Sequence, residues 1–220
     1  MAPNPGGFGF FILGIPNMKK VMFFFDGFNV YHSLKEVPQY KKFKWLDLHT
    51  LAKFFVTKKE VISEVYYFTA YATWLPDSMK RHKILVKALE GAGVKVILGE
   101  FKNKDKFCRN CKTWFRTKEE KQTDVNIASY LFREAFLDRY DKAILVTVDS
   151  DLVPAIELVK KTFPGKEMVL LTPIRRNSYA LQKICDYRMK IKEKHLIASQ
   201  FPDIIPLQNG KELLRPPEWQ

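Results

Sequence analysis

The sequence of 220 residues has few cysteines, no long apolar run and no glycine-rich phosphate loop. Three cysteines do not suit a disulfide framework, and this small odd number favours a reducing cytoplasm. No apolar run approaches the ~20 residues that a membrane helix needs. Neither standard glycine-rich phosphate-binding pattern occurs, so an ATP- or NAD-dependent enzyme has no support.

Positive charge and aromatic rings are abundant. Lysine and arginine number 37 against 24 acidic residues, the net charge is +13, and 18 residues are phenylalanine. The length suits one α/β domain with a full core. The basic excess favours a polyanionic partner, most simply nucleic acid, although a basic surface kept for solubility explains the charge alone equally well.

The first 17 residues, "MAPNPGGFGFFILGIPN", carry no charge and are rich in glycine and proline. Part of this segment imitates a signal-peptide core, but no basic residues precede it and no small-residue cleavage site follows. We therefore expect residues 1–18 to be a leader or a disordered N-terminus. Residues 19–200 are expected to form a single domain, and residues 201–220 a C-terminal tail.

Strands and helices alternate along the predicted domain. Apolar runs predict strands at 19–25, 63–71, 94–101, 142–148 and 167–173, with a short one near 187–191. Helices are expected near 29–36, from about Asp77 to Gly91, over 123–139 and 151–161, and near 177–185. A charged, cysteine-bearing loop is expected at 102–121. The alternation predicts a doubly wound domain: a three-layer α/β/α sandwich with a mostly parallel central sheet.

Acidic residues follow two of the predicted strands. Asp26 ends the first strand, and Asp149 and Asp151 follow the fourth. In open α/β sheets ligands bind outside the carboxyl ends of the strands, so these acids converge if the two strands are neighbours. Asp124 lies in the first turn of helix 123–139, on the stripe expected to pack on the sheet, and should point toward the same crevice.

Each acid also has an ordinary structural explanation, as a helix cap or, for Asp26, as part of a turn. Four caps, however, would not need to converge, and four carboxylates in one cleft repel unless protons or cations compensate. One or two Mg²⁺ or Mn²⁺ ions are the economical compensation, because carboxylate oxygens suit hard cations. Asn29 is expected to hold Asp26 or a metal-bound water, or else to cap the helix that follows.

The cysteines Cys108 and Cys111 form a CxxC motif. Structural zinc wants four ligands, Cys185 lies far along the chain, and the four histidines show no zinc spacing. A half-site completed by a second subunit of a homodimer stays open, but a reduced, exposed pair is favoured, and zinc is not expected here.

Basic and aromatic residues surround the CxxC motif. Cations on the backbone and rings under the bases suit single-stranded nucleic acid, which singles out Arg109, Trp114, Arg116 and Lys121. The alternative is that Trp114 and Phe115 anchor the loop on the core. Beyond the fifth strand, "PIRRNS" adds Arg175 and Arg176 on the same side of the sheet.

Three motifs together resemble a known family: "FFFDGFNVYHSL", "KQTDVNIASYL" and "ILVTVDSDLVPAIELVKK" are similar to the NYN domain of the LabA-like group, within the PIN-like ribonuclease superfamily. The resemblance covers most of residues 19–200. It implies a PIN-like sandwich, RNA as the usual substrate, and a Mg²⁺ or Mn²⁺ centre at Asp26, Asp124, Asp149 and Asp151 with Asn29 beside it.

The sequence therefore predicts a divalent-metal-dependent endoribonuclease in which a metal-activated water attacks the phosphodiester. The alternative is a non-catalytic RNA-binding module whose acidic pocket is structural or only binds metal. A small-molecule phosphatase ranks third, because such substrates need no long positive track. DNA as the substrate stays open.

Overall fold

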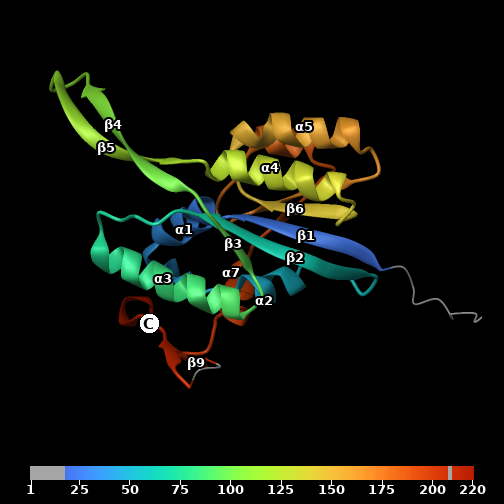
Figure 1. The fold of residues 1–220 in the computed structure, drawn as a ribbon, viewed down its shortest axis with the longest axis horizontal. Coiled ribbons are helices and arrows are strands. Elements are labelled where there is room, and N and C mark those ends of the chain that lie inside the picture. Colours follow the sequence, from blue (N-terminus) through green and yellow to red (C-terminus); the bar gives the residue numbers. More distant parts are fainter. Residues whose placement is uncertain (1–17, 208–209) are drawn as a thin grey trace, which may run out of the picture.

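The computed structural model describes residues 18–207 and 210–220 (Figure 1). The segment expected as a leader therefore lies, apart from Met18, outside the described residues. The central sheet has six strands in the order β3-β2-β1-β6-β7-β8. The strands are β1 (Lys19–Asp26), β2 (Glu60–Thr69), β3 (Lys95–Leu98), β6 (Lys142–Val146), β7 (Glu167–Thr172) and β8 (Tyr187–Lys190).

Each neighbouring pair in this sheet is parallel, as the alternation of strands and helices predicts. The chain runs outward from β1 to β3 on one side and from β6 to β8 on the other. The direction of winding reverses between β1 and β6, which pair directly. The first and fourth strands of the predicted order are therefore neighbours, and the topological switch point lies between them.

The central strand β1 is buried on both faces, which explains its unbroken apolar sequence. Side chains alternate along a strand, so Val21, Phe23 and Phe25 enter one hydrophobic layer while Met22 and Phe24 enter the other. Asp26 has the parity of Met22 and Phe24, which lie in the layer that includes α4.

Helices cover both faces of the sheet (Figure 1). The layer with Phe23 and Phe25 contains α1 (Gly27–Lys35), η1 (Pro38–Lys44), α2 (Leu48–Lys53), α3 (Pro76–Gly91) and α7 (Glu193–Ala198). The opposite layer contains α4 (Thr123–Phe136), η2 (Ser150–Leu152), α5 (Val153–Thr162) and α6 (Tyr179–Ile184). The predicted α/β/α sandwich is confirmed. Across residues 18–207 and 210–220, none of the helices combines the length and hydrophobicity needed to cross a bilayer.

The segment expected as a loop is a β-hairpin that projects from the body of the protein (Figure 1). It consists of β4 (Glu100–Cys108) and β5 (Thr113–Lys121), paired antiparallel along their whole length. The predicted strand at 94–101 is accordingly wrong at its end, because β3 stops at Leu98. Lysines alternate along β4 on a side that is never buried, so no apolar period indicates the strand.

The C-terminal residues, expected as a tail, contribute to the core. They form β9 (Ile204–Pro206), β10 (Glu212–Leu214) and η3 (Pro217–Trp219). Phe201 and Trp219 are buried against Trp45, with ring centroids 5.4 and 6.3 Å away. The indole nitrogen of Trp45 also donates a hydrogen bond to the carbonyl of Pro202 at 2.8 Å. This segment therefore closes the layer that holds α1 and α3.

Candidate active site

Asp26 lies at the carboxyl end of β1 and is 2% exposed. One carboxylate oxygen accepts a hydrogen bond from the Asn29 backbone N–H at 3.0 Å. The other accepts from the Thr147 hydroxyl at 2.9 Å and from the Asn29 side-chain amide. Burial raises the pKa of Asp26 and the charge of Asp149 adds to it, although the hydrogen bonds from Asn29 and Thr147 oppose the rise.

Asn29 links the two central strands. Its amide nitrogens donate to Asp26, and its side-chain oxygen accepts from the Val148 backbone N–H at 3.3 Å, in the segment after β6. Asp26, rather than Asn29, is the N-cap of α1. The structure therefore favours the role of Asn29 in holding Asp26 over the capping alternative.

Asp149 and Asp151 follow β6. Asp149 is the N-cap of the short helix η2, and Asp151 lies within that helix. The Asp149 carboxylate accepts from the Asp151 N–H at 3.0 Å. The Asp149 N–H donates to the Thr147 hydroxyl oxygen at 3.1 Å. The buried Thr147, which sequence reasoning missed, therefore joins Asp149 and Asp26 through one hydroxyl group, while Asp151 is exposed.

Asp124 is partly buried in the first turn of α4. Burial is the largest cause that raises its pKa, and the charges of Asp149, Asp26, Glu120 and Asp151 follow in that order; together they raise it from 3.8 to about 6. The four predicted acids are thus close enough to repel one another. Their convergence follows from β1 and β6 being neighbours and from α4 lying beside them.

Glu120, at the end of β5, is a fifth acid at this edge that sequence reasoning missed. Its carboxylate accepts from the Thr123 backbone N–H at 3.0 Å and from the Thr123 hydroxyl. It therefore satisfies the start of α4, which leaves Asp124 without that capping role. The only sequence signal was an acid three positions before a threonine that opens a helix, a spacing typical of local side-chain caps.

The donor set fits a divalent cation. Its carboxylates are hard oxygen ligands, and burial together with the charges of the neighbouring acids raises the pKa of Asp124. Among the described residues, however, no three histidine, cysteine or acidic side chains are arranged to hold a metal ion. Magnesium usually keeps several waters and takes only one or two protein carboxylates, so such a site does not need three direct ligands.

The residues predicted to bind nucleic acid at 102–121 all lie on the hairpin. Trp114 is 71% exposed, so the alternative that it anchors this segment on the core is wrong. Arg116 pairs with Asp105 at 3.0 Å, and Arg109 lies in the turn. Lys121 ends β5 and pairs with Glu119 at 2.8 Å.

Arg175 and Arg176 follow β7, beyond the same edge of the sheet as Asp149. Arg175 is exposed and has a positive φ of 59°. Arg176 is partly buried and forms an ion pair with Glu36, next to the end of α1. Arg175 is therefore more accessible to a phosphate than Arg176, whose guanidinium is already paired with a carboxylate.

Cys108 and Cys111 flank the turn of the hairpin, far in the fold from the buried Cys185. The Cys111 sulfur lies 2.9 Å from the Thr113 hydroxyl oxygen. Hydrogen bonds from Thr113 and then Cys108 lower the pKa of the Cys111 thiol. The motif thus brings together two thiols, half of what a structural zinc ion requires.

A parallel α/β/α sandwich with carboxylates gathered at its switch point is the architecture of PIN-like nucleases. The sequence profile of the NYN domain matches residues 20–192, and the chain belongs to this family. The confirmed family resemblance places the protein in a nuclease superfamily whose members generally use divalent metals.

Two further proteins are similar to this chain. The 6-hydroxy-3-succinoylpyridine 3-monooxygenase HspA of Pseudomonas putida (strain DSM 28022 / S16) is 26% identical over 236 residues, covering 89% of this chain and 74% of that protein. A crystal structure of a protein of unknown function from Vibrio parahaemolyticus RIMD 2210633 superposes with a TM-score of 0.55 and 21% identity. It covers 80% of this chain and 94% of the other, and it supports the fold.

Proposed function

We propose that this protein is a divalent-metal-dependent endoribonuclease. The observation that carries the proposal is the placement of Asp26, Asp124, Asp149 and Asp151 together at the switch point of an NYN domain, where Thr147 links Asp26 to Asp149. A Mg²⁺ or Mn²⁺ ion held there would act as a Lewis acid, activating water and neutralising charge on the phosphate. The unpaired cysteines are consistent with action in the reducing cytoplasm.

The surrounding residues position the acids. Asn29 and Thr147 use their hydrogen bonds to hold the Asp26 carboxylate in one orientation. The Asp149 carboxylate caps η2 and is oriented by the hydrogen bond that it accepts from the N–H of Asp151. Asp124, whose pKa is about 6, is ionised at neutral pH but can accept a proton more readily than an ordinary aspartate. We assign Asp26, Asp124, Asp149 and Asp151 to metal binding and Asn29 to positioning.

The hairpin suits the RNA strand. Over residues 100–121 it carries eight basic residues and four acidic ones, and it presents the exposed rings of Phe107, Trp114 and Phe115. Cations that track the backbone and rings that stack on bases are the common elements of single-strand binding. Its base leads into α4 at Thr123, directly before Asp124, so an RNA strand lying along the hairpin would lead to the acidic edge.

The test is cleavage of end-labelled single-stranded RNA by the purified protein with Mn²⁺, with Mg²⁺ and with EDTA. Asp149→Asn, purified identically, controls for contaminating nucleases. Cleavage that disappears both in EDTA and in the variant is the expected result. Cleavage that persists in the variant contradicts the proposal. RNA binding that ignores EDTA, without any cleavage, would instead favour the non-catalytic RNA-binding module.

A second candidate function is the binding and conversion of an aromatic acid. It comes from the relative named as a monooxygenase of 6-hydroxy-3-succinoylpyridine. This chain has a cavity of about 290 Å³ lined by aromatic rings and cations, which suits an aromatic acid. Calorimetric titration with 6-hydroxy-3-succinoylpyridine tests this candidate. Binding of this compound, together with an absence of RNA cleavage, would favour it over the nuclease.

A further inference from the structure

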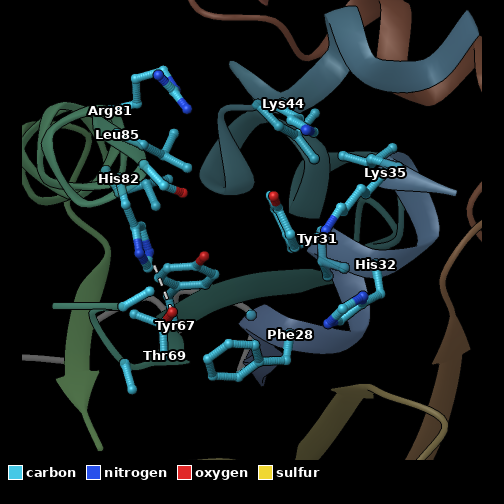
Figure 2. Close-up of a pocket in the computed structure, with 18 of the residues that line it drawn as sticks. Phe28, Tyr31, His32, Lys35, Lys44, Tyr67, Thr69, Arg81, His82 and Leu85 are labelled. Atoms are coloured by element: carbon cyan, nitrogen blue, oxygen red, sulfur yellow. Dashed lines mark hydrogen bonds between the residues drawn. The ribbon is translucent and has the colours of Figure 1, made fainter. Parts of the chain in front are cut away.

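The cavity of about 290 Å³ lies between α1, η1, β2 and α3, on the face of the sheet opposite α4 (Figure 2). Pockets for small ligands begin at about this volume. Aromatic rings from several elements line it: Phe28 and Tyr31 from α1, Tyr67 from β2, and Trp74 from the turn before α3. Such walls accept a flat ring by stacking.

The floor of the cavity is polar. The Thr69 hydroxyl oxygen lies 3.2 Å from Nε2 of His82, the contact drawn as a dashed line in Figure 2. Burial lowers the pKa of His82 to about 4, so its imidazole is neutral at physiological pH. A neutral imidazole and a hydroxyl offer both donors and acceptors, which is what recognition of the edge of a heterocyclic ring requires.

Positive charges crowd the opposite wall. Lys44 lies over the Tyr31 ring with its nitrogen 4.8 Å from the centroid, and Lys35 approaches the same ring at 5.8 Å. Figure 2 shows these lysines facing His82 and Arg81 across the cavity. Burial lowers the pKa of Lys44, and repulsion from Lys35, Lys41 and Arg81 lowers it further.

Within residues 18–207 and 210–220, neither Lys35 nor Lys44 has a carboxylate within 4.0 Å. Arg81, by contrast, pairs with Glu218 at 2.7 Å. Two lysines that converge on one tyrosine without an anion make a site for a negatively charged group. The cavity therefore combines aromatic walls with two lysines positioned to contact an anion.

The cavity adjoins the acidic edge. Gly27, which directly follows Asp26, lines it, and a Cβ atom there would lie 2.8 Å from the Tyr67 ring and 2.6 Å from the Phe68 carbonyl oxygen. Only glycine lets the ring pack this closely against the start of α1. The cavity wall and the candidate active site thus share one turn of the chain.

The cavity also adjoins the hairpin. Phe101 of β4 contacts Phe28 with ring centroids 5.4 Å apart and Trp74 with centroids 4.7 Å apart. Lys118 of β5 lies over Trp74, 5.4 Å from the centroid. A row of rings and a cation therefore connects the proposed RNA-binding hairpin to the mouth of the cavity.

We propose that this cavity is a subsite for one nucleotide of the RNA, with the base between the aromatic walls and a phosphate at Lys35 and Lys44. The inference rests on the proposed function, because the acidic edge and the hairpin define the path of the strand. It makes the cavity a determinant of which base lies beside the scissile phosphate. A base in a shaped slot with polar atoms at its floor is discriminated more strongly than one stacked on an open surface.

The test is calorimetric titration of the full chain, in EDTA, with the four ribonucleoside 5′-monophosphates, with adenosine, with ribose 5-phosphate and with salicylate. We expect at least one nucleotide to bind more tightly than adenosine or ribose 5-phosphate, since the site needs both ring and phosphate. Lys44→Gln and Tyr31→Leu should each weaken that nucleotide about tenfold or more. Lys53→Gln, on the exposed end of α2, is the matched control and should bind as the wild type does.

Three results would overturn the inference: no nucleotide binds, Lys44→Gln binds as tightly as the wild type, or salicylate or ribose 5-phosphate binds as tightly as the best nucleotide. RNA cleavage by the same preparations separates this inference from the proposed function. Cleavage without nucleotide binding removes the subsite and keeps the nuclease. Nucleotide binding that Lys44→Gln weakens, without cleavage, keeps the nucleotide site and removes the nuclease.

Discussion

Replacing Asp124 with asparagine should stabilise the metal-free protein at neutral pH. Its pKa rises from 3.8 to about 6 because of burial and the charges of the neighbouring acids. A carboxyl group whose pKa is raised by folding favours the protonated form in the folded state, so its ionisation opposes folding. The destabilisation caused by ionised Asp124 is absent well below pH 3.8. It grows as the pH rises and reaches its full size above about pH 6.

The magnitude follows from the size of this change in pKa. Without screening, it corresponds to about 3 kcal/mol of free energy of unfolding. Asp124 is only partly buried, and water screens its charge, so about 1–1.5 kcal/mol is the expected gain from Asp124→Asn. For a chain of 220 residues this is an increase of roughly 2–5 °C in Tm.

The assay is urea and thermal unfolding in EDTA at about pH 7.5 and about pH 4, where most of the gain should be gone. The control variant Glu157→Gln removes an exposed charge from α5 and should leave the free energy of unfolding unchanged at both pH values. Added Mg²⁺ should raise the Tm of the wild type more than that of the variant, because only the wild type retains the full repulsion. A variant that is less stable than the wild type at pH 7.5 in EDTA, or one that gains equally at both pH values, refutes the reasoning.

Three other changes test the remaining assignments. The double variant Arg175→Ala, Arg176→Ala should weaken RNA binding and flatten its salt dependence. Unchanged binding in a salt titration would contradict the assignment of these two arginines to RNA binding. Trp114→Ala should cost about 1–3 kcal/mol of single-stranded RNA affinity by fluorescence anisotropy, yet leave urea unfolding within about 0.5 kcal/mol because the side chain is 71% exposed. Asn29→Ala should abolish cleavage and destabilise the protein by about 1–3 kcal/mol, since buried Asp26 loses its partner; an active, equally stable variant contradicts this.

The fold was predictable where local pattern and tertiary burial agree. The run that forms β1 is apolar throughout because both faces of the strand are covered, and α4 has an apolar stripe at helical spacing because one side meets the sheet. The hairpin was not predictable from periodicity. Its lysines at 102, 104 and 106 alternate with residues that are also exposed, so no contrast between an inner and an outer face exists.

The candidate site was predictable in its four acids and in Asn29, which lies three residues after Asp26. Asp26 and Asp149 follow from the rule that parallel strands present their carboxyl ends at one edge, and Asp124 follows from the apolar stripe of its helix. Thr147 could not be found this way, because its hydrogen bond to Asp26 joins positions 121 residues apart and threonine at a strand end carries no distinctive signal. The cavity was hidden for the same reason: its lining comes from elements far apart in the sequence, and each residue alone is typical of a core or a surface position.

The two explanations for the acidic residues, helix cap and metal ligand, are not exclusive. Asp26 caps α1 and Asp149 caps η2, so each of these two carboxylates is oriented by N–H groups at the start of a helix. The Asp26 cap places a negative charge at the N-terminus of α1, where the helix dipole favours it. Asp124 has no such partner among the described residues, because Glu120 satisfies Thr123 instead, and its pKa is raised to about 6. Asp124 therefore carries a charge that a bound cation would relieve.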